Sequence, residues 1–216
     1  MVTKKKTVKV RDSDVTQRDL LDAVGRILSE QGFRGLKTNE IARHVGKDKN
    51  LIRYYFENLE GLEKAYIAEK DYWPPFFERF KIGGDSTLDE VKNMFTELMQ
   101  ENFRFFLANP EMQQIILWQI SEANPLLTHI SEQREIEGAK LLGLTDPYFK
   151  DSGVDFRMIL ALLLGGIYYV VLHARYNKST VSGIDVNRPK DRDSLIKTIE
   201  QVLEWAWQAA ENKKTK

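Results

Sequence analysis

The sequence contains no cysteine among its 216 residues and only three histidines. Without cysteine there is no disulfide framework, no cysteine nucleophile and no thiolate metal site. This absence fits a reducing compartment, and we expect a cytoplasmic protein. The basic N-terminus is not followed by an apolar segment, so it lacks the pattern of a secretory signal peptide.

Motifs of common enzymes are also missing. The chain has neither the G-x-S-x-G of serine hydrolases nor the H-E-x-x-H of zinc proteases. Gly138 and Gly143 have the spacing of a phosphate-binding loop, but Leu144 stands where that loop requires lysine. We therefore expect no enzyme, no bound metal and no cofactor.

The chain has no apolar run of the ~20 residues that a bilayer-spanning helix needs. Its most apolar segment runs from Met158 to Leu172 and is flanked by Arg157 and His173. We predict that this segment is a fully buried helix. A membrane span is the minor alternative.

The net charge of zero conceals an asymmetry along the chain. Residues 1–56 contain 13 basic and 7 acidic side chains, a net charge of +6, and the remainder carries −6. The basic side chains include a run from Lys4 to Arg11. A basic N-terminal region followed by an acidic remainder indicates that a polyanionic partner binds at the N-terminal end only. The alternative is a solvated lysine tail on an ordinary domain.

Helical periodicity dominates from Thr16 onward, and no stretch alternates as a strand would. Leu20, Val24, Ile27 and Leu28 form one apolar stripe, and Gly32 is suited to a left-handed cap after the first helix. We predict an all-α fold with a basic flexible arm at 1–14, a three-helix DNA-binding domain with a helix-turn-helix at 15–60, and a larger helical bundle for ligand binding and dimerisation at 61–216. Its later helices are expected near 87–107, 110–122, 124–143, 155–177 and 192–211.

Residues 38–56 have the pattern of a helix-turn-helix. Ile41, Ala42 and Val45 form the inner face of a short helix, and Gly46 allows the tight turn that follows. Asp48 can cap the next helix, whose start and outer face present Lys47, Lys49, Asn50, Arg53 and Tyr54. The N-terminal residues of such a helix reach base edges in a DNA groove, and the flanking basic groups bind phosphates.

The segment GFRGLKTNEIARHVGKDKNLIRYYFENLEGL resembles the DNA-binding segment of TetR-family transcriptional regulators. The family pattern is a Gly-aromatic turn, Ile-Ala, a glycine-led turn, a short helix ending in aromatic-x-x-Phe and a leucine a few residues later. The matching positions are Gly32-Phe33, Ile41-Ala42, Gly46, Phe56 and Leu62. The close match covers roughly 50 residues, and the rest resembles the family in helical character and length.

The segment departs from the family pattern at two positions that usually bind phosphate. Arg53 replaces a common tyrosine, and its guanidinium can still bind phosphate, whereas Leu59 replaces a common lysine and cannot. Lys37 is then the expected phosphate contact before the second helix, and Thr38 is a candidate cap. The predicted DNA-binding residues are Lys37, Thr38, Lys47, Lys49, Asn50, Arg53, Tyr54 and Tyr55.

The last two expected helices have the composition of an interface. Leu195, Ile199, Val202 and Leu203 spread over a wide apolar arc, which needs more than one packing surface. Gly165-Gly166 in the preceding helix permits close backbone approach. The resemblance implies that these helices form a homodimer, and the residues fit a four-helix seam across a twofold axis. Burial within one chain is the alternative.

The resemblance also implies that the body binds a small-molecule effector. Aromatic and polar side chains can supply hydrogen bonds within an apolar wall. Ordinary core packing is the alternative for each such residue. The candidate ligand-binding residues are Phe103, Phe106, Trp118, His129 and Tyr168.

Together these features predict a sequence-specific DNA-binding transcriptional regulator. We expect a repressor that a small molecule releases from a palindromic operator, with double-stranded DNA as its partner and no membrane. The alternative is a helical interaction module whose basic head binds RNA or an anionic membrane.

Overall fold

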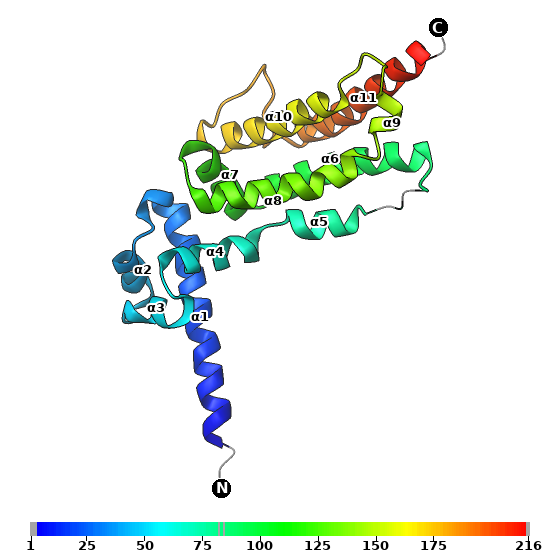
Figure 1. Cartoon of the computed structure of the whole chain (residues 1–216). Helices are drawn as coiled ribbons and strands as arrows, with labels where there is room; N and C mark the ends of the chain where they lie inside the picture. Colours follow the sequence, from blue (N-terminus) through cyan, green and yellow to red (C-terminus); the bar gives the residue numbers. More distant parts are fainter. Residues whose placement is uncertain (1–3, 82, 84, 215–216) are drawn as a thin grey trace. The chain divides into compact units, whose positions relative to one another are not determined.

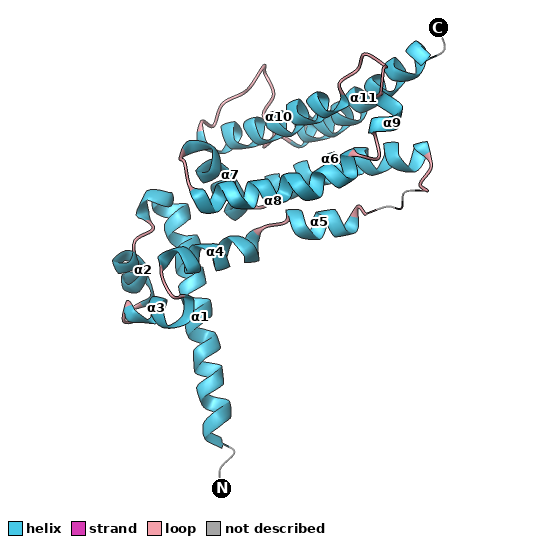
Figure 2. Ribbon diagram, in the orientation of Figure 1, coloured by secondary structure: helices cyan, strands magenta, loops and turns pink. Residues whose placement is uncertain are grey.

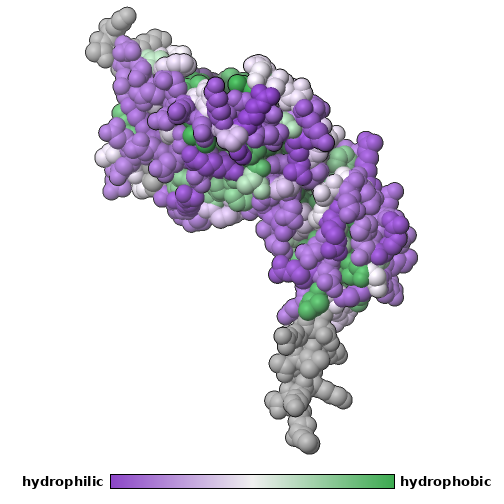
Figure 3. Space-filling model, turned by 180° about the vertical axis from the view of Figure 1, so that it is seen from behind, coloured by the Kyte–Doolittle hydropathy of each residue, from purple (hydrophilic) through white to green (hydrophobic). Residues whose placement is uncertain are grey.

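The structure is a computed structural model that describes the backbone of residues 4–81, 83 and 85–214 and the side chains of residues 13–81, 83 and 85–212 (Figure 1). In the part described, every element of regular secondary structure is a helix (Figure 2). The only β-bridge there is an isolated antiparallel pair, Val181–Ile184. The predicted all-α fold class is therefore confirmed. The surface seen in Figure 3 is mainly hydrophilic and is interrupted by hydrophobic patches.

The chain forms two compact units. Unit 1 comprises residues 1–71 and 110–128, and unit 2 comprises residues 72–109 and 129–216. The predicted boundary at residue 60 falls inside unit 1. The elements of unit 1 are α1 (Lys4–Gln31), the 3-10 helix η1 (Phe33–Gly35), α2 (Thr38–Val45), α3 (Asn50–Phe56), α4 (Leu59–Lys70) and α7 (Pro110–Ser121).

Unit 2 contains the longer helices of the chain. Its elements are α5 (Trp73–Arg79), α6 (Leu88–Ala108), most of α8 (Pro125–Leu142), α9 (Asp146–Phe149), α10 (Phe156–Tyr176) and α11 (Pro189–Lys214). Four of these six helices agree with their predicted ranges to within a few residues. The short helices α5 and α9 were not predicted separately.

The first helix begins well before its predicted start near Thr16. The backbone of α1 is helical from Lys4, so residues 4–14 continue the helix toward the N-terminus. The basic side chains predicted to form an arm, Lys4 to Arg11, lie outside the described side chains.

The predicted apolar stripe of α1 forms the core of unit 1. Leu20, Val24, Ile27 and Leu28 are all buried. After α1, Gly32 has φ +69° and ψ −176°, so it takes a positive φ as expected but not the left-handed helical ψ predicted for it. This conformation redirects the chain into η1.

Unit 2 is organised around α6. A capping box in which Thr87 and Glu90 bond each other's backbone fixes the start of this helix. Both α10 and α11 pack against α6 and against each other. A cluster of stacked and tilted rings from Phe149, Phe156 and Trp207 fills the space near α9.

The prediction that the segment from Met158 to Leu172 is fully buried is wrong. Met158, Leu162 and Tyr169 are 57%, 69% and 58% exposed. They lie on one face of α10, because residues spaced by three or four share a helix face. In length and mean hydropathy (1.8) α10 could cross a membrane, although the mostly buried core helix of a soluble protein meets the same criterion. Here only 28% of its most apolar window is buried.

Candidate nucleic-acid interface

The helix-turn-helix predicted for residues 38–56 is present as α2, a short turn and α3. Gly46 ends α2 in the left-handed conformation (φ 67°, ψ 29°), and its N–H donates to carbonyl oxygens of the last turn of α2. Ile41 from α2 and Ile52 from α3 are buried in unit 1. The N-cap of α3 is Lys49 and not the predicted Asp48, which lies one residue earlier; the side-chain Oδ1 of Asp48 accepts a hydrogen bond from the N–H of Asn50 at 2.8 Å.

The outer face of α3 is polar and cationic. Lys49, Asn50, Arg53 and Tyr54 are exposed, and Tyr54 is 78% exposed. Tyr55 is half-buried and meets Tyr54 edge to face at 4.8 Å between ring centroids. Within the described side chains, no carboxylate forms an ion pair with Lys49 or Arg53. Their charges are therefore available to an external anion.

The N-terminus of α2 differs from the prediction in one respect. Lys37 occupies the N-cap with extended dihedral angles (φ −135°, ψ 141°), and Thr38 is the first helical residue. The prediction that Thr38 caps this helix is therefore wrong, and Lys37 makes no side-chain cap bond. The first backbone N–H groups of a helix without a side-chain cap can receive an anion. Lys37 is exposed beside them.

Lys47 is not free at the surface as predicted. Its Nζ lies 2.8 Å from Oδ2 of Asp19 and donates to Oγ1 of Thr16 at 3.0 Å. Both partners lie on α1, so Lys47 links the turn to the first helix. This ion pair gives Lys47 a structural explanation that needs no nucleic acid.

The five predicted ligand residues are divided between the two units. Phe103 and Phe106 are buried on α6, and the ring of Phe106 lies 4.5 Å from that of Tyr168. Trp118 belongs to unit 1, where it stacks on Phe33 with 6.0 Å between centroids. His129 is exposed.

An interior group in unit 2 was not predicted. We call Tyr72, Trp73, Asn102, Arg134 and Tyr168 the polar cluster. Asn102 is fully buried, its Nδ2 donates to Tyr72 Oη at 2.6 Å, and Trp73 Nε1 donates to Tyr168 Oη at 3.2 Å. The two hydroxyl oxygens are 3.1 Å apart.

The sequence does hold a signal for this cluster. Asn102 shares a helix face with Met99 and Phe106, both of which are buried. An amide at a core position needs hydrogen-bond partners. Searching the apolar stripe of α6 for such a residue would have identified Asn102.

Burial changes the pKa of several groups. Burial is the main cause that raises the pKa of the Tyr72 hydroxyl well above its ordinary value, and it also raises that of Tyr168. In unit 1, burial and then the charge of Glu60 raise the pKa of Glu63 to about 7.

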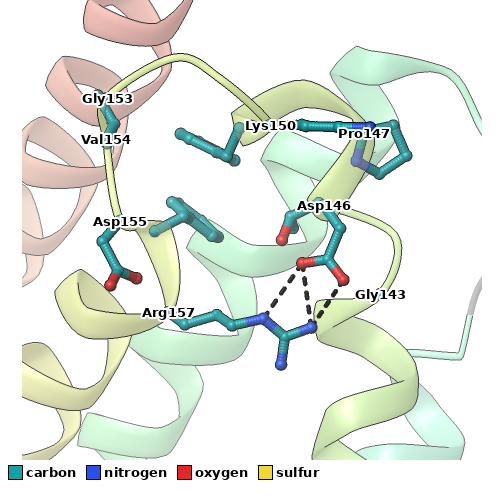
Figure 4. Close-up of a pocket in the computed structure, with 11 residues that line it drawn as sticks. Gly143, Asp146, Pro147, Lys150, Gly153, Val154, Asp155 and Arg157 are labelled. Carbon is teal, nitrogen blue, oxygen red and sulfur yellow. Dashed lines mark hydrogen bonds and ion pairs between the residues drawn. The ribbon is translucent and has the colours of Figure 1, made fainter.

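A surface pocket of about 820 Å³ lies in unit 2 where α8, α9 and α10 meet (Figure 4). Arg157 forms a two-pronged ion pair with Asp146 across it, with nitrogen–oxygen distances of 2.8 to 3.1 Å. Lys150 and Asp155 are the other charged residues that line the pocket. None of the predicted ligand residues lines it. Among the described residues, no group of three histidine, aspartate or glutamate side chains could hold a metal ion.

Comparison with known proteins connects the chain with transcription regulators. No family model matches it. The HTH-type transcriptional repressor SCO4008 of Streptomyces coelicolor is 20% identical over 198 residues, which cover 90% of this chain and 98% of that protein. The HTH-type transcriptional repressor NicS of Pseudomonas putida is 23% identical over 116 residues, 54% of this chain and 53% of that protein.

Solved structures share the fold over most of the chain. A putative fatty acid metabolism regulator from Clostridium perfringens has a TM-score of 0.63 at 15% identity and covers 85% of this chain and 97% of its own. A TetR family regulator from Marinobacter aquaeolei has a TM-score of 0.55 at 20% identity (93% and 97% covered). FadR from Bacillus subtilis, solved with stearoyl-CoA, has a TM-score of 0.59 at 18% identity (89% and 98% covered).

These comparisons confirm the predicted resemblance. The chain has the fold of TetR-family regulators, and the two curated relatives it matches are helix-turn-helix transcriptional repressors.

Proposed function

We propose that the protein is a dimeric, sequence-specific DNA-binding repressor. The observation that carries this proposal is the outer face of α3, where exposed cationic and polar side chains that form no ion pair with the described residues follow a glycine turn. A helix that presents such groups enters the major groove, and basic groups beside it bind the phosphates. The site of action is then the cytoplasm, and the protein is not an enzyme.

Each side chain of the proposed interface has a distinct role. Lys49 and Asn50, at the start of α3, read base edges, because the amide of asparagine and the ammonium of lysine match the donors and acceptors of the major groove. Lys37 and Arg53 bind phosphates on either side. Tyr54 adds a hydroxyl contact to the backbone.

The second surface of the proposal is an apolar stripe, defined as Met158, Leu162 and Tyr169 of α10 with Trp205 of α11. Trp205 is 60% exposed, and the two helices pack side by side. Between these large side chains, Gly165 and Gly166 have no atom within 4 Å of an added Cβ, so a second backbone can approach closely. Large exposed apolar surface of this kind marks an interface. A second copy packed here gives the four-helix seam that the sequence predicts.

Two copies then present two α3 helices to one face of the duplex. Their half-sites lie about one helical turn apart, ~34 Å, on a palindromic operator. A small molecule bound in unit 2 releases the operator when it favours the form whose α3 helices do not match this spacing. The structural relative from Bacillus subtilis holds stearoyl-CoA, which supports an amphipathic effector.

Selection of bound duplexes from a random pool tests this function. We expect full-length protein to enrich a palindrome, and Asn50→Ala to enrich a palindrome that is degenerate at one or two positions per half-site. Lys81→Ala, an exposed lysine in unit 2, is the control and should enrich the wild-type sequence. Equal binding of random duplex, RNA and anionic vesicles would instead support the alternative of a general polyanion-binding module.

A further inference from the structure

The polar cluster of unit 2 has hydrogen-bonding groups that its own members do not satisfy. The two tyrosines contribute two hydroxyl protons, and the 3.1 Å contact between Tyr72 and Tyr168 uses one of them. Asn102 is fully buried, and its Oδ1 accepts no hydrogen bond from the described residues. A buried amide oxygen without a donor costs free energy. One donor and one acceptor thus remain for a further polar group.

The positive charge of Arg134 favours the binding of an anion at this cluster. Arg134 lies on α8, and its positive charge acts on the hydroxyls of both Tyr72 and Tyr168. One terminal nitrogen of its guanidinium, Nη2, is buried. Because burial raises the pKa of both tyrosines, their hydroxyls stay protonated and can donate. The cluster therefore contains several donors for an acceptor oxygen.

The surroundings of the cluster are aromatic. The ring of Tyr72 lies 5.1 Å from Phe76 and 4.6 Å from Phe105, and Phe106 packs on Tyr168. Phe77 and Phe105 are only half-buried. An apolar wall beside a small group of polar atoms is the usual composition of a ligand site.

Helix α8 covers this region loosely. From His129 to Lys140 no residue of α8 is buried, although the helix belongs to unit 2 there. On its inner face, Gly138 follows Arg134 by one turn, and a Cβ added to it would lie 3.9 Å from the ring of Phe77. Between residues 129 and 140 the inner face of α8 therefore offers a cation and a small residue and no buried apolar side chain.

We propose that the polar cluster binds the carboxylate of an amphipathic monocarboxylic acid, whose hydrocarbon chain lies against the phenylalanines of α5 and α6. One carboxylate oxygen accepts from Arg134 and the other from the Tyr168 hydroxyl, and a hydroxyl or water beside the head donates to Asn102 Oδ1. This inference deepens the proposed function, because such an acid would be the effector.

Isothermal titration of the full-length protein with dodecanoate, below its micelle concentration and without DNA, tests the proposal. We expect saturable binding with one site per chain. Dodecanol should bind at least tenfold more weakly, because a hydrogen bond to a charged group is lost with the carboxylate. Dodecanoyl-CoA should also bind more weakly than the free acid. Equal or tighter binding of either compound would overturn the assignment of a carboxylate head.

Three variants localise the binding. Arg134→Met and Tyr168→Phe each keep most of the side-chain volume and should weaken dodecanoate binding about tenfold or more, while Arg134→Met should leave dodecanol binding unchanged. Lys140→Met, an exposed cation on the outer side of the same helix, is the matched control and should bind like the wild type. Wild-type affinity in both cluster variants, with folding verified by circular dichroism, would refute the proposal.

Titration of the selected duplex on the same samples separates the two proposals. A protein that binds its duplex but not dodecanoate would disprove this inference and leave the proposed function intact. A protein that binds dodecanoate through Arg134 but selects no duplex would disprove the proposed function and leave the carboxylate site intact.

Discussion

The outer face of α3 and the polar cluster of unit 2 use similar side chains in opposite environments. On α3, Lys49 and Arg53 are exposed and have no ion pairs among the described residues, so their charges are open to a polyanion in water. In the cluster, Asn102 is fully buried among rings. An exposed cation binds phosphates through screened electrostatics, whereas a buried polar group binds one small head through hydrogen bonds. Salt should therefore affect the first site far more than the second.

The largest expected effect comes from separating the two copies of α3. Leu162→Arg places a charge in the centre of the apolar stripe and should convert the dimer to monomer, with a loss of operator affinity of about a hundredfold or more. Analytical ultracentrifugation and duplex titration measure the two effects.

Ile136→Arg is the control for this variant. Ile136 is also an exposed apolar residue, 53% exposed, but it lies on α8 outside the stripe. It should leave both the sedimentation and the affinity unchanged. A Leu162→Arg protein that still sediments as a dimer would show that the copies meet elsewhere.

The second largest expected effect is the loss of affinity when one phosphate contact is removed. Arg53→Ala should weaken binding of every duplex about tenfold and reduce the slope of log K against log salt by about 0.9. Fluorescence anisotropy over a range of salt concentrations measures the slope, with Lys81→Ala as control. A changed base preference at an unchanged slope would mean that Arg53 reads a base.

Lys47 is expected to affect stability more than binding. Lys47→Met and Asp19→Asn each remove the partly exposed ion pair between the turn and α1. Each should therefore lower the free energy of unfolding by about 0.5–1 kcal/mol and Tm by roughly 2–4 °C. The double variant should cost little more than either single variant, because the partners act on each other. The salt slope for duplex binding should not change. A slope reduced by Lys47→Met would restore the sequence-based prediction that this lysine contacts phosphate.

The smallest effect is a pH dependence from Glu63. Its pKa in the folded protein is about 7, above the ordinary value of 4.5, so the folded state holds the proton more tightly than the unfolded state. The resulting stability is complete below about pH 4.5 and is lost as the pH rises toward 7. Glu63→Gln should therefore raise Tm at pH 8 and have little effect at pH 5.

Solvent screening of this partly exposed carboxyl limits the gain to about 0.5 kcal/mol. Thermal unfolding at the two pH values measures it, and Glu60→Gln is the matched variant. An equal gain at pH 5 and pH 8 would contradict a burial effect on ionisation.

Local patterns predicted the fold and the helix-turn-helix well. The apolar stripe of α1 and the turn at Gly46 depend on neighbouring residues, and their structure follows the prediction. The position of Tyr54 outside and Tyr55 half inside also follows from helical periodicity.

Features that depend on distant residues were missed. The partner of Lys47 is 28 residues away, and no local pattern reveals it. Tyr72 and Tyr168 are 96 residues apart, so their contact depends on how helices pack. The apolar segment from Met158 to Leu172 was predicted to be buried because composition does not distinguish a core face from an interface face.

Hydroxyl-radical footprinting of the full-length protein on its selected duplex tests the central claim most directly. The account predicts two protected backbone patches on one face of the duplex, centred about one helical turn apart, and loss of protection beside each patch in Arg53→Ala. A single patch, or uniform protection along the duplex, would contradict a paired molecule that inserts two α3 helices.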